Sequence, residues 1–201
     1  MPFKHIPVML PQVLHYLNCK PGKIYVDCTL GGSGHARAIC EKIVPDGVLI
    51  GIDQDIDAIQ NATKVLKRFD LNIRLFHDNF VNLTELLRQL RIAAVDGILL
   101  DLGISLHQLE SSGRGFSFNK EEPLDMRMNI EARTKAEDLI NSMEEKSLRK
   151  IFQEYGEERW AGQIAKKIVQ QRQRKAIRSS AMLAQIVCEA VPKQASSNQK
   201  I

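Results

Sequence analysis

The sequence lacks the features that mark membrane, secreted or metal-stapled proteins. Its 201 residues contain no uninterrupted run of about 18 apolar residues, so we expect no membrane-spanning helix. The first six residues have neither a signal-peptide core nor an Arg-rich amphipathic leader. The four cysteines form no C-x-x-C pair and have no histidine at metal-ligand spacing, which argues against a disulfide framework or a zinc site. We therefore expect a cytoplasmic protein without a metal site or a membrane partner.

Positive charge is unevenly distributed along the chain, whose net charge is +4. Residues 1–105 contain 11 basic and 11 acidic side chains, whereas residues 106–201 contain 17 basic and 13 acidic ones. The stretch from Arg159 to Cys188 contains seven basic side chains and no acidic one. Such a stretch can bind phosphates, although a solvated helix face is an equally good interpretation of this pattern alone.

Short apolar runs alternate with helical patterns in the first half of the chain. Runs typical of buried strands cover residues 24–27, 48–53, 72–77 and 95–101, and amphipathic helical patterns cover residues 35–43, 55–68 and 81–90. Continuous apolar strands that alternate with helices are typical of parallel sheets with right-handed crossovers. We therefore predict the α/β class, with a doubly wound parallel sheet of which four strands are present.

The second half of the chain has a different pattern. Residues 106–133 are rich in glycine, serine, proline and charge, and predict a long ordered loop. Helical patterns follow from residue 134, including ranges 157–173 and 180–191. We expect three parts, namely a Rossmann-like half at 1–105, the loop at 106–133 as an ordered substrate or cofactor loop, and a helical domain at 134–201.

Two local signals predict a helix that starts after Ser142 and ends before Gly156. Ser142 followed by Glu145 is typical of a capping box. An apolar stripe ended by Gly156 follows it, formed by Leu148, Ile151, Phe152 and Tyr155.

A glycine-rich turn follows the first expected strand. The segment Cys28-Thr-Leu-Gly-Gly-Ser-Gly-His35 allows the backbone to approach a ligand at the start of a helix. Asp53 lies nineteen residues after Gly34, at the end of the second strand, where a carboxylate can accept both hydroxyls of an adenosine ribose. The two features together predict a site for an adenosine-containing cofactor.

Dinucleotide enzymes share this layout, so a nicotinamide-dependent oxidoreductase is an alternative function. In G-x-G-x-x-G register from Gly32, the third glycine is replaced by Arg37, which weakens the fit to a pyrophosphate. Asp27, just before the turn, suits instead the cationic methionine end of S-adenosylmethionine. The residues therefore favour S-adenosylmethionine over NAD.

Several longer strings are more specific than this layout. They are His5-Ile-Pro-Val-Met-Leu10, Asp27–His35, Gly51–Asp55, Leu99–Ser105, Gln108-Leu109, Arg114-Gly-Phe-Ser-Phe118, Pro123-Leu-Asp-Met-Arg-Met128 and Tyr155-Gly-Glu-Glu-Arg159. The Arg-Gly-Phe and Leu-Asp-Met-Arg strings are not general methyltransferase motifs. With them the chain resembles the family of bacterial 16S ribosomal RNA cytosine-N4-methyltransferases known as RsmH or MraW, from about His5 to the last residue.

The resemblance implies a class I Rossmann-like methyltransferase with a helical domain inserted after the fourth strand. It implies S-adenosylmethionine as cofactor and, as substrate, a cytidine in the decoding region of 16S ribosomal RNA within the small ribosomal subunit. The cofactor-binding positions that it implies are Ser33, Gly34, His35, Asp53, Phe80, Asp101 and Gln108. Without the resemblance, Phe80 is equally well explained as a core residue and His35 as an ordinary polar residue at a helix start.

Asp101 is also the candidate catalytic residue, because it ends the fourth expected strand at the ligand-binding edge of the sheet. The lone pair of cytosine N4 is delocalised into the ring and becomes nucleophilic only when the amine is held and rotated. A carboxylate at this edge can hold that amine or contact the cofactor. A capping aspartate is the alternative role for Asp101.

Two departures from the family pattern are visible in the sequence. Ser33 replaces a glycine, so we expect this position to avoid a strongly positive φ. Family members continue past Ile201 with further strands, so we expect a C-terminally truncated sequence, with a non-catalytic RNA-binding remnant as the alternative function.

The resemblance also makes residues 159–178 a candidate clamp for ribosomal RNA and places 114–118 near the target base. The general base and the oligomeric state stay open.

Overall fold

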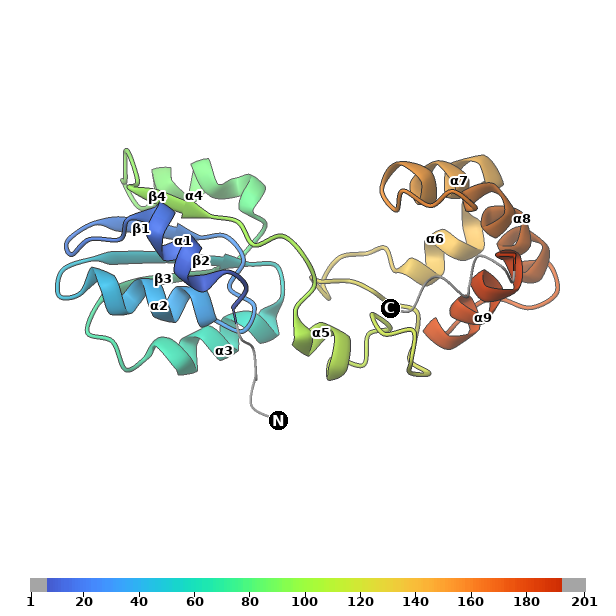
Figure 1. The fold of residues 1–201 in the computed structure, drawn as a ribbon, viewed down its shortest axis with the longest axis horizontal. Helices are drawn as coiled ribbons and strands as arrows, with labels where there is room; N and C mark the ends of the chain where they lie inside the picture. Colours follow the sequence, from blue (N-terminus) through green and yellow to red (C-terminus); the bar gives the residue numbers. More distant parts are fainter. Residues whose placement is uncertain (1–6, 193–201) are drawn as a thin grey trace. The chain divides into compact units, whose positions relative to one another are not determined.

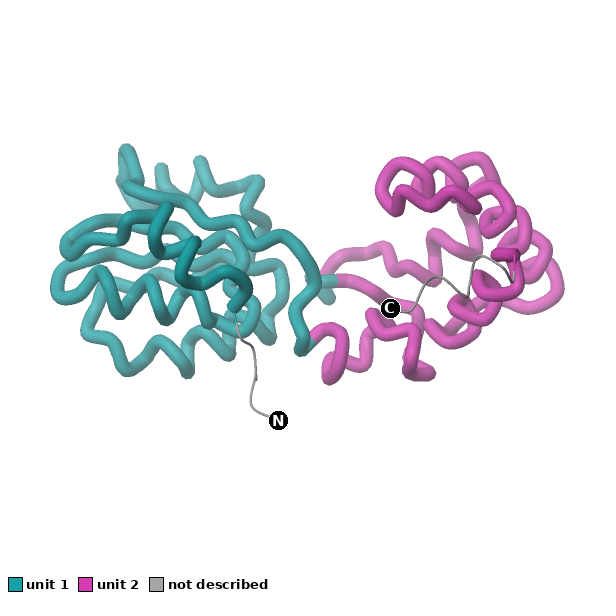
Figure 2. Tube along the Cα trace, viewed as in Figure 1, with its two compact units in different colours: residues 1–107, 128–130 teal, residues 108–127, 131–201 magenta. Residues whose placement is uncertain are grey.

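The computed structural model describes residues 7–192, so His5 and Ile6 of the first family string lie outside the described residues. The chain divides into two compact units (Figure 1, Figure 2). Unit 1 comprises residues 1–107 and 128–130, and unit 2 comprises residues 108–127 and 131–201.

Unit 1 is built on a four-stranded parallel sheet with the order β3-β2-β1-β4. Its strands are β1 (Ile24–Asp27), β2 (Val48–Asp53), β3 (Asn72–His77) and β4 (Gly97–Leu99). Asp27 pairs with Gly51 and with Leu99, and Asp53 pairs with His77, so the carboxyl ends of neighbouring strands lie at one edge of the sheet. The predicted parallel sheet is confirmed.

Helices cover both faces of this sheet (Figure 1). They are α1 (Leu10–Leu17), α2 (Gly34–Ile43), α3 (Ile56–Leu66) and α4 (Leu83–Gln89), the last preceded by the 3-10 helix η1 (Phe80–Asn82). Successive strand residues point to opposite faces, so Tyr25 and Leu49 pack in one apolar cluster with α2 and α3. Val26 and Ile50 pack in a second cluster with α4. The two clusters make unit 1 a doubly wound fold.

β4 is shorter than the expected strand over residues 95–101. It is the last strand in the order and pairs with β1 alone among the described strands. Ile98 and Leu100, on and just after it, are about half exposed. A strand with one partner forms fewer ladder hydrogen bonds, although β3, the other edge strand, has six residues.

Unit 2 is helical. Its helices are α6 (Ala136–Ser142), α7 (Glu145–Glu154), α8 (Ala161–Arg172) and α9 (Ser180–Ala190), and α5 (Leu106–Glu110) begins in unit 1 and ends in unit 2. One apolar cluster holds α6–α9 together, with Leu148, Ile164, Ile168 and Ile186 buried in it. The expected loop at 106–133 therefore contains one short helix, and the helices after residue 134 are confirmed.

Two local expectations in unit 2 are wrong. Ser142 is the last residue of α6, where its hydroxyl donates to the Asp138 carbonyl at 2.6 Å, so it does not cap α7. Asp138 instead accepts the backbone N–H of Lys135 at 2.8 Å and closes the start of α6. Tyr155 lies past the end of α7 and is 83% exposed, so it does not belong to the apolar stripe.

α8 also starts later than the expected range of 157–173. Glu157 has φ of 50°, a left-handed conformation that interrupts any helix. No helix within residues 7–192 is long and apolar enough to cross a bilayer.

Candidate functional site

Asp27 is the most deeply buried acid at the carboxyl edge of the unit 1 sheet. Its side chain is fully buried, and Oδ1 accepts the backbone N–H of Thr29 at 3.1 Å. Its Oδ2 has no hydrogen-bond partner among the described residues. Burial, and then the negative charges of Asp53 and Asp101, raise the pKa of Asp27 to about 7. A buried acceptor without a donor is costly in a folded protein, and a cationic or hydrogen-bonding ligand group can offset that cost.

Asp53 ties the glycine turn to the end of β2. Its Oδ2 accepts the backbone N–H of Gly31 at 2.9 Å, and its Oδ1 accepts the N–H of Asp55 at 2.9 Å. Burial raises the pKa of Asp53 above its ordinary value, although these backbone bonds oppose the shift. Each carboxylate oxygen has a second lone pair, so this carboxylate can still accept two hydroxyls of a ribose.

Ser33 has φ of 64°, so the expectation that this position avoids a positive φ is wrong. The turn requires the conformation, because the Ser33 N–H donates to the Leu30 carbonyl at 2.6 Å and closes the loop before α2. The Ser33 hydroxyl accepts a hydrogen bond from Asn61 Nδ2 at 3.2 Å. A positive φ costs conformational energy at a serine but not at a glycine, and the bond to Asn61 offsets part of that cost.

The first turn of α2 is covered by the residues just before α1. A Cβ at Gly34 would lie 2.9 Å from side-chain carbons of Pro7, so this glycine permits a close approach of the chain to itself. The next residue, His35, is buried, with Nε2 2.9 Å from the Val8 carbonyl oxygen. A carbonyl can only accept, so Nε2 carries the hydrogen and the His35 ring has a fixed direction.

Asp101 follows β4 and is held through its backbone. Its N–H donates to Thr29 Oγ1 at 2.8 Å, and Thr29 in turn contacts Asp27. The Oδ2 of Asp101 lies 3.6 Å from Nδ1 of His35, so the catalytic candidate and a cofactor-loop candidate are neighbours. The structure thus brings Asp27, Asp53 and Asp101 into one electrostatically coupled group around the glycine turn.

Phe80 opens η1, directly after β3. It is half buried and packs against the apolar cluster that includes Val26 and Ile52. Asp78, just before it, was not among the sequence candidates, although it follows β3 as closely as Asp101 follows β4. Its Oδ1 accepts the N–H of Asn79 at 2.7 Å and Asn82 Nδ2 at 2.8 Å. An acid directly after an expected strand was the signal that would have found it.

Gln108 is the one sequence candidate that belongs to unit 2. It lies in α5, and its side chain is buried. The preceding residue, His107, belongs to unit 1 and faces the first turn of α3, with Nε2 3.0 Å from Asp57 Oδ2.

A family model described as the MraW methylase family matches residues 2–201. The chain belongs to the MraW methylase family. It is 48% identical over 201 residues to "Ribosomal RNA small subunit methyltransferase H" of Desulfosudis oleivorans, and 50% identical over 201 residues to the protein of that name from Desulforapulum autotrophicum. Each alignment covers all of this chain and 64% of the relative. The protein of the same name from Clostridioides difficile is 42% identical over 195 residues, which are 97% of this chain and 63% of that relative. The chain thus spans less than two thirds of the length of these family members.

Two of the strings that carried the family resemblance, Arg114–Phe118 and Pro123–Met128, are joined by hydrogen bonds, one of them from the Met126 N–H to the Arg114 carbonyl at 2.8 Å. Arg114 is buried, and its Nη1 donates to the Arg127 carbonyl at 3.0 Å. Arg127 makes a two-pronged pair with Asp125, Nε to Oδ1 and Nη2 to Oδ2, each at 2.7 Å. A Cβ on Gly115 would lie 2.3 Å from the Pro123 carbonyl oxygen, so only glycine fits where the two strings cross. These residues fix the loop's shape.

Part of the basic stretch at 159–178 is neutralised by acids from other helices. Lys167 Nζ lies 3.2 Å from Glu189, and Arg178 Nε lies 3.8 Å from Glu137. Arg172 Nη1 donates to the Ile140 carbonyl at 2.8 Å. The stretch therefore has fewer unpaired cations in the structure than its lack of acids in the sequence suggested.

Within the part of the chain that the structure describes, no three His, Cys, Asp or Glu side chains are grouped to hold a metal ion.

Proposed function

We propose that this chain is the cofactor-binding part of a methyltransferase that uses S-adenosylmethionine. In this proposal the enzyme methylates the N4 amino group of a cytidine in the decoding region of 16S ribosomal RNA, within the small ribosomal subunit and in the cytoplasm. The names of its relatives support ribosomal RNA of the small subunit as the substrate class. The observation that carries the proposal for this chain is the group of three carboxylates around the glycine turn.

These carboxylates distinguish between the two cofactors that share the layout. The pyrophosphate of NAD is anionic and would be repelled by ionised Asp27 and Asp101, whereas Asp53 could accept ribose hydroxyls of either cofactor. The sulfonium and ammonium groups of S-adenosylmethionine are cationic, and the unpartnered Oδ2 of Asp27 is an acceptor for such a group. Bound S-adenosylmethionine supplies an electrophilic methyl group.

The proposed roles of the other positions are those that the family resemblance implies. The turn from Ser33 to His35 would hold the cofactor, and Asp53 would accept the ribose hydroxyls. Phe80, half buried beside the carboxyl edge, would contact the adenine. Gln108 would lie at the mouth of the site, and the helices after residue 134 would form a domain inserted into the sheet fold.

Asp101 is the proposed catalytic residue. Its carboxylate would accept an N–H of the cytosine amine and hold the nitrogen lone pair out of conjugation with the ring. Thr29 fixes the Asp101 backbone at 2.8 Å, so the carboxylate is positioned before substrate binds. Nδ1 of His35 at 3.6 Å is the nearest basic group that the structure records for it.

Calorimetric titration of the 201-residue chain with S-adenosylmethionine, and separately with NAD, tests the cofactor. We expect saturable binding of S-adenosylmethionine that Asp53→Ala weakens by at least about tenfold, because two hydrogen bonds to a charged acceptor are lost. Asp70→Ala removes an exposed acid outside the site and should leave the affinity unchanged. Binding of NAD instead, or equal binding by Asp53→Ala, would contradict the proposal.

Transfer of labelled methyl groups to small ribosomal subunits tests the activity. We expect Asp101→Ala and Asp101→Asn to lower turnover by about 100-fold at saturating cofactor, a loss larger than any change in cofactor affinity. Normal turnover in both variants would exclude a catalytic role for Asp101. RNA binding with no transfer by this chain would support the alternative function of a non-catalytic RNA-binding unit.

A further inference from the structure

One exposed face of α7 carries a row of cations that the sequence pattern did not single out. Lys146, Arg149 and Lys150 are exposed and stand at i, i+3 and i+4. Residues at this spacing lie on the same side of a helix. Their charges therefore act at one place on unit 2, rather than being spread around the helix.

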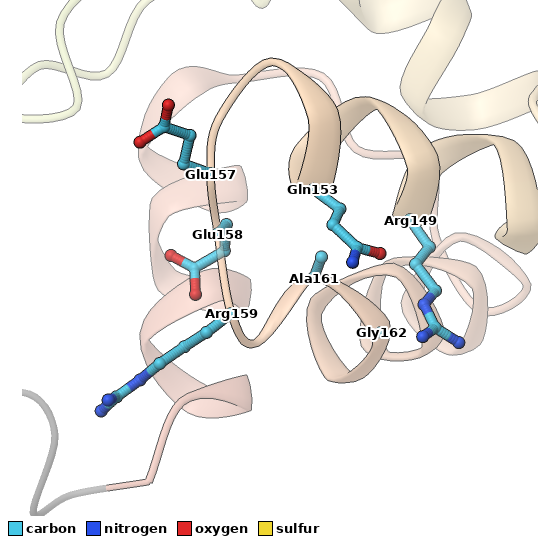
Figure 3. Close-up of a pocket in the computed structure, with 7 residues that line it drawn as sticks. All are labelled: Arg149, Gln153, Glu157, Glu158, Arg159, Ala161 and Gly162. Atoms are coloured by element: carbon cyan, nitrogen blue, oxygen red, sulfur yellow. The ribbon is translucent and has the colours of Figure 1, made fainter.

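Two adjoining hollows lie along this row. The first, of about 300 Å³, is lined by Arg149, Gln153, Glu157, Glu158, Arg159, Ala161 and Gly162 (Figure 3). The second, of about 290 Å³, is lined by Lys146, Arg149, Lys150, Gln153 and Glu154. Arg149 and Gln153 line both hollows, so the two form one continuous depression along α7 and the start of α8, which we call the α7 groove.

The lining of the α7 groove contains four cations, Lys146, Arg149, Lys150 and Arg159, and three acids, Glu154, Glu157 and Glu158. In Figure 3, Arg149 and Gln153 project from α7, whereas Glu157 and Glu158 project from the far side of the connecting loop. Glu158 already accepts the N–H of Trp160 through Oε1 at 2.7 Å. Glu154 lies 3.9 Å from Lys150 in an exposed pair, a geometry that contributes little stability. No ion pair to Arg149 or Lys146 is present within residues 7–192.

We propose that the α7 groove binds the phosphate backbone of RNA, with Lys146, Arg149 and Lys150 contacting phosphates. The proposal rests on the proposed function only for the choice of RNA as the polyanion. It moves the main RNA contact from the 159–178 stretch, whose Lys167 and Arg178 are paired with acids, to the exposed face of α7, and only the start of that stretch lines the groove.

Fluorescence anisotropy with a labelled 12-nucleotide oligouridylate at several salt concentrations tests the groove. The triple variant Lys146→Gln/Arg149→Gln/Lys150→Gln should bind at least about tenfold more weakly, and the slope of log affinity against log salt should become shallower by about 2.

The matched control is Lys166→Gln/Arg174→Gln/Lys175→Gln, which removes three exposed cations of the 159–178 stretch and changes the net charge equally. We expect a change of less than about threefold. Glu154→Gln should strengthen binding about twofold, a gain that misfolding cannot produce. Circular dichroism melts of each variant verify folding.

The outcomes separate this inference from the proposed function. Equal RNA affinity of the α7 variant and the wild type, or a larger loss in the control variant, overturns the α7 groove while RNA remains the substrate. Absence of RNA binding by a wild-type chain that binds S-adenosylmethionine also overturns the groove and leaves the cofactor proposal intact. Binding to anionic lipid vesicles with the same dependence on the α7 cations, and none to RNA, would assign the groove to a membrane surface instead.

Discussion

The buried carboxylates at the sheet edge of unit 1 and the ion-paired carboxylates of unit 2 stand in opposite electrostatic surroundings. At the sheet edge of unit 1, burial raises the pKa values of Asp27 and Asp53. In unit 2, hydrogen bonds from Arg127 and Lys167 lower the pKa values of Asp125 and Glu189. Unit 2 therefore neutralises these acids with its own cations, whereas unit 1 keeps buried negative charge that a cationic ligand can neutralise. This difference is the physical reason for assigning cofactor binding to unit 1 and the polyanion to unit 2.

The units also differ at their left-handed turns. Unit 1 places Ser33 at φ of 64° next to the cofactor loop, whereas unit 2 uses Gly115 at φ of 79° where its loop crosses itself. A serine can occupy the first position because space and a hydrogen-bond donor are available there. A side chain at Gly115 would collide with the Pro123 carbonyl.

The largest effect is expected from the pH dependence of Asp27. Its pKa is about 7 in the folded chain against 3.8 for an ordinary aspartate, so its contribution to stability is fully present below pH 4 and is lost as the pH rises through 7. This loss is of the order of 4 kcal/mol in the free energy of unfolding. Asp27→Asn should flatten the profile measured by urea denaturation between pH 4 and 8.

Asp125→Asn is the matched comparison for that experiment. The pKa of Asp125 is lowered by Arg127, so its stabilising contribution is present above pH 4 and is lost as the pH falls. Asp125→Asn should therefore lower the free energy of unfolding at pH 7, and it should lower it less at acidic pH. Identical pH profiles for wild type and Asp27→Asn would contradict the contrast between the two units.

A smaller effect is expected at the crossing of the unit 2 loop. Gly115→Ala combines an unfavourable φ with a Cβ 2.3 Å from the Pro123 carbonyl oxygen, and should cost about 3 kcal/mol in the free energy of unfolding. Gly113→Ala has φ of 67° with open space around the Cβ, and should cost only about 1–2 kcal/mol. Equal losses in denaturation experiments would show that the close approach does not constrain the loop.

The smallest effect is expected at Ser33. Ser33→Gly relieves about 1 kcal/mol of backbone strain and loses one hydrogen bond of similar size, so the net change should be within about 1 kcal/mol. Ser33→Ala keeps the strain and loses the bond to Asn61, and should be destabilised by about 1 kcal/mol. Thermal melts of the two variants measure the difference. An Ala variant more stable than the Gly variant would show that the positive φ at residue 33 is not strained.

Much of unit 1 was predictable from local pattern. The bounds of β1, β2 and β3 agree with the expected strands. β1 and β2 are largely buried and mostly apolar, as expected of central parallel strands, whereas β3 is an edge strand that also contains Asn72, Arg74 and His77. Asp53 and Asp101 were found from their places after strands, since parallel strands bring their carboxyl ends to one edge. The φ of Ser33 was predicted wrongly. The serine in place of the family's glycine suggested an ordinary φ, but hydrogen bonds to Leu30 and Asn61, which the sequence does not reveal, hold the turn with a positive φ.

The charges of unit 2 show the limit of linear pattern. The stretch at 159–178 has no acid in sequence, yet Glu137 and Glu189 lie against it in space. The row on α7 was overlooked because Glu145, Glu154 and the acids after it dilute its charge along the sequence. Which cations stay unpaired depends on helix packing that no window of residues contains.

The sequence by itself determined the family, from its specific strings, and it also determined the parallel character of the strands and an acid at or just after the end of three of them, because these last two follow from local periodicity and chain direction. Only the tertiary structure decided that Asp27 is buried with one oxygen unpartnered, that Pro7 covers Gly34, and which basic side chains remain free. Burial and ion pairing depend on residues that are distant in sequence and adjacent in space, so their energies become defined only when the chain is folded.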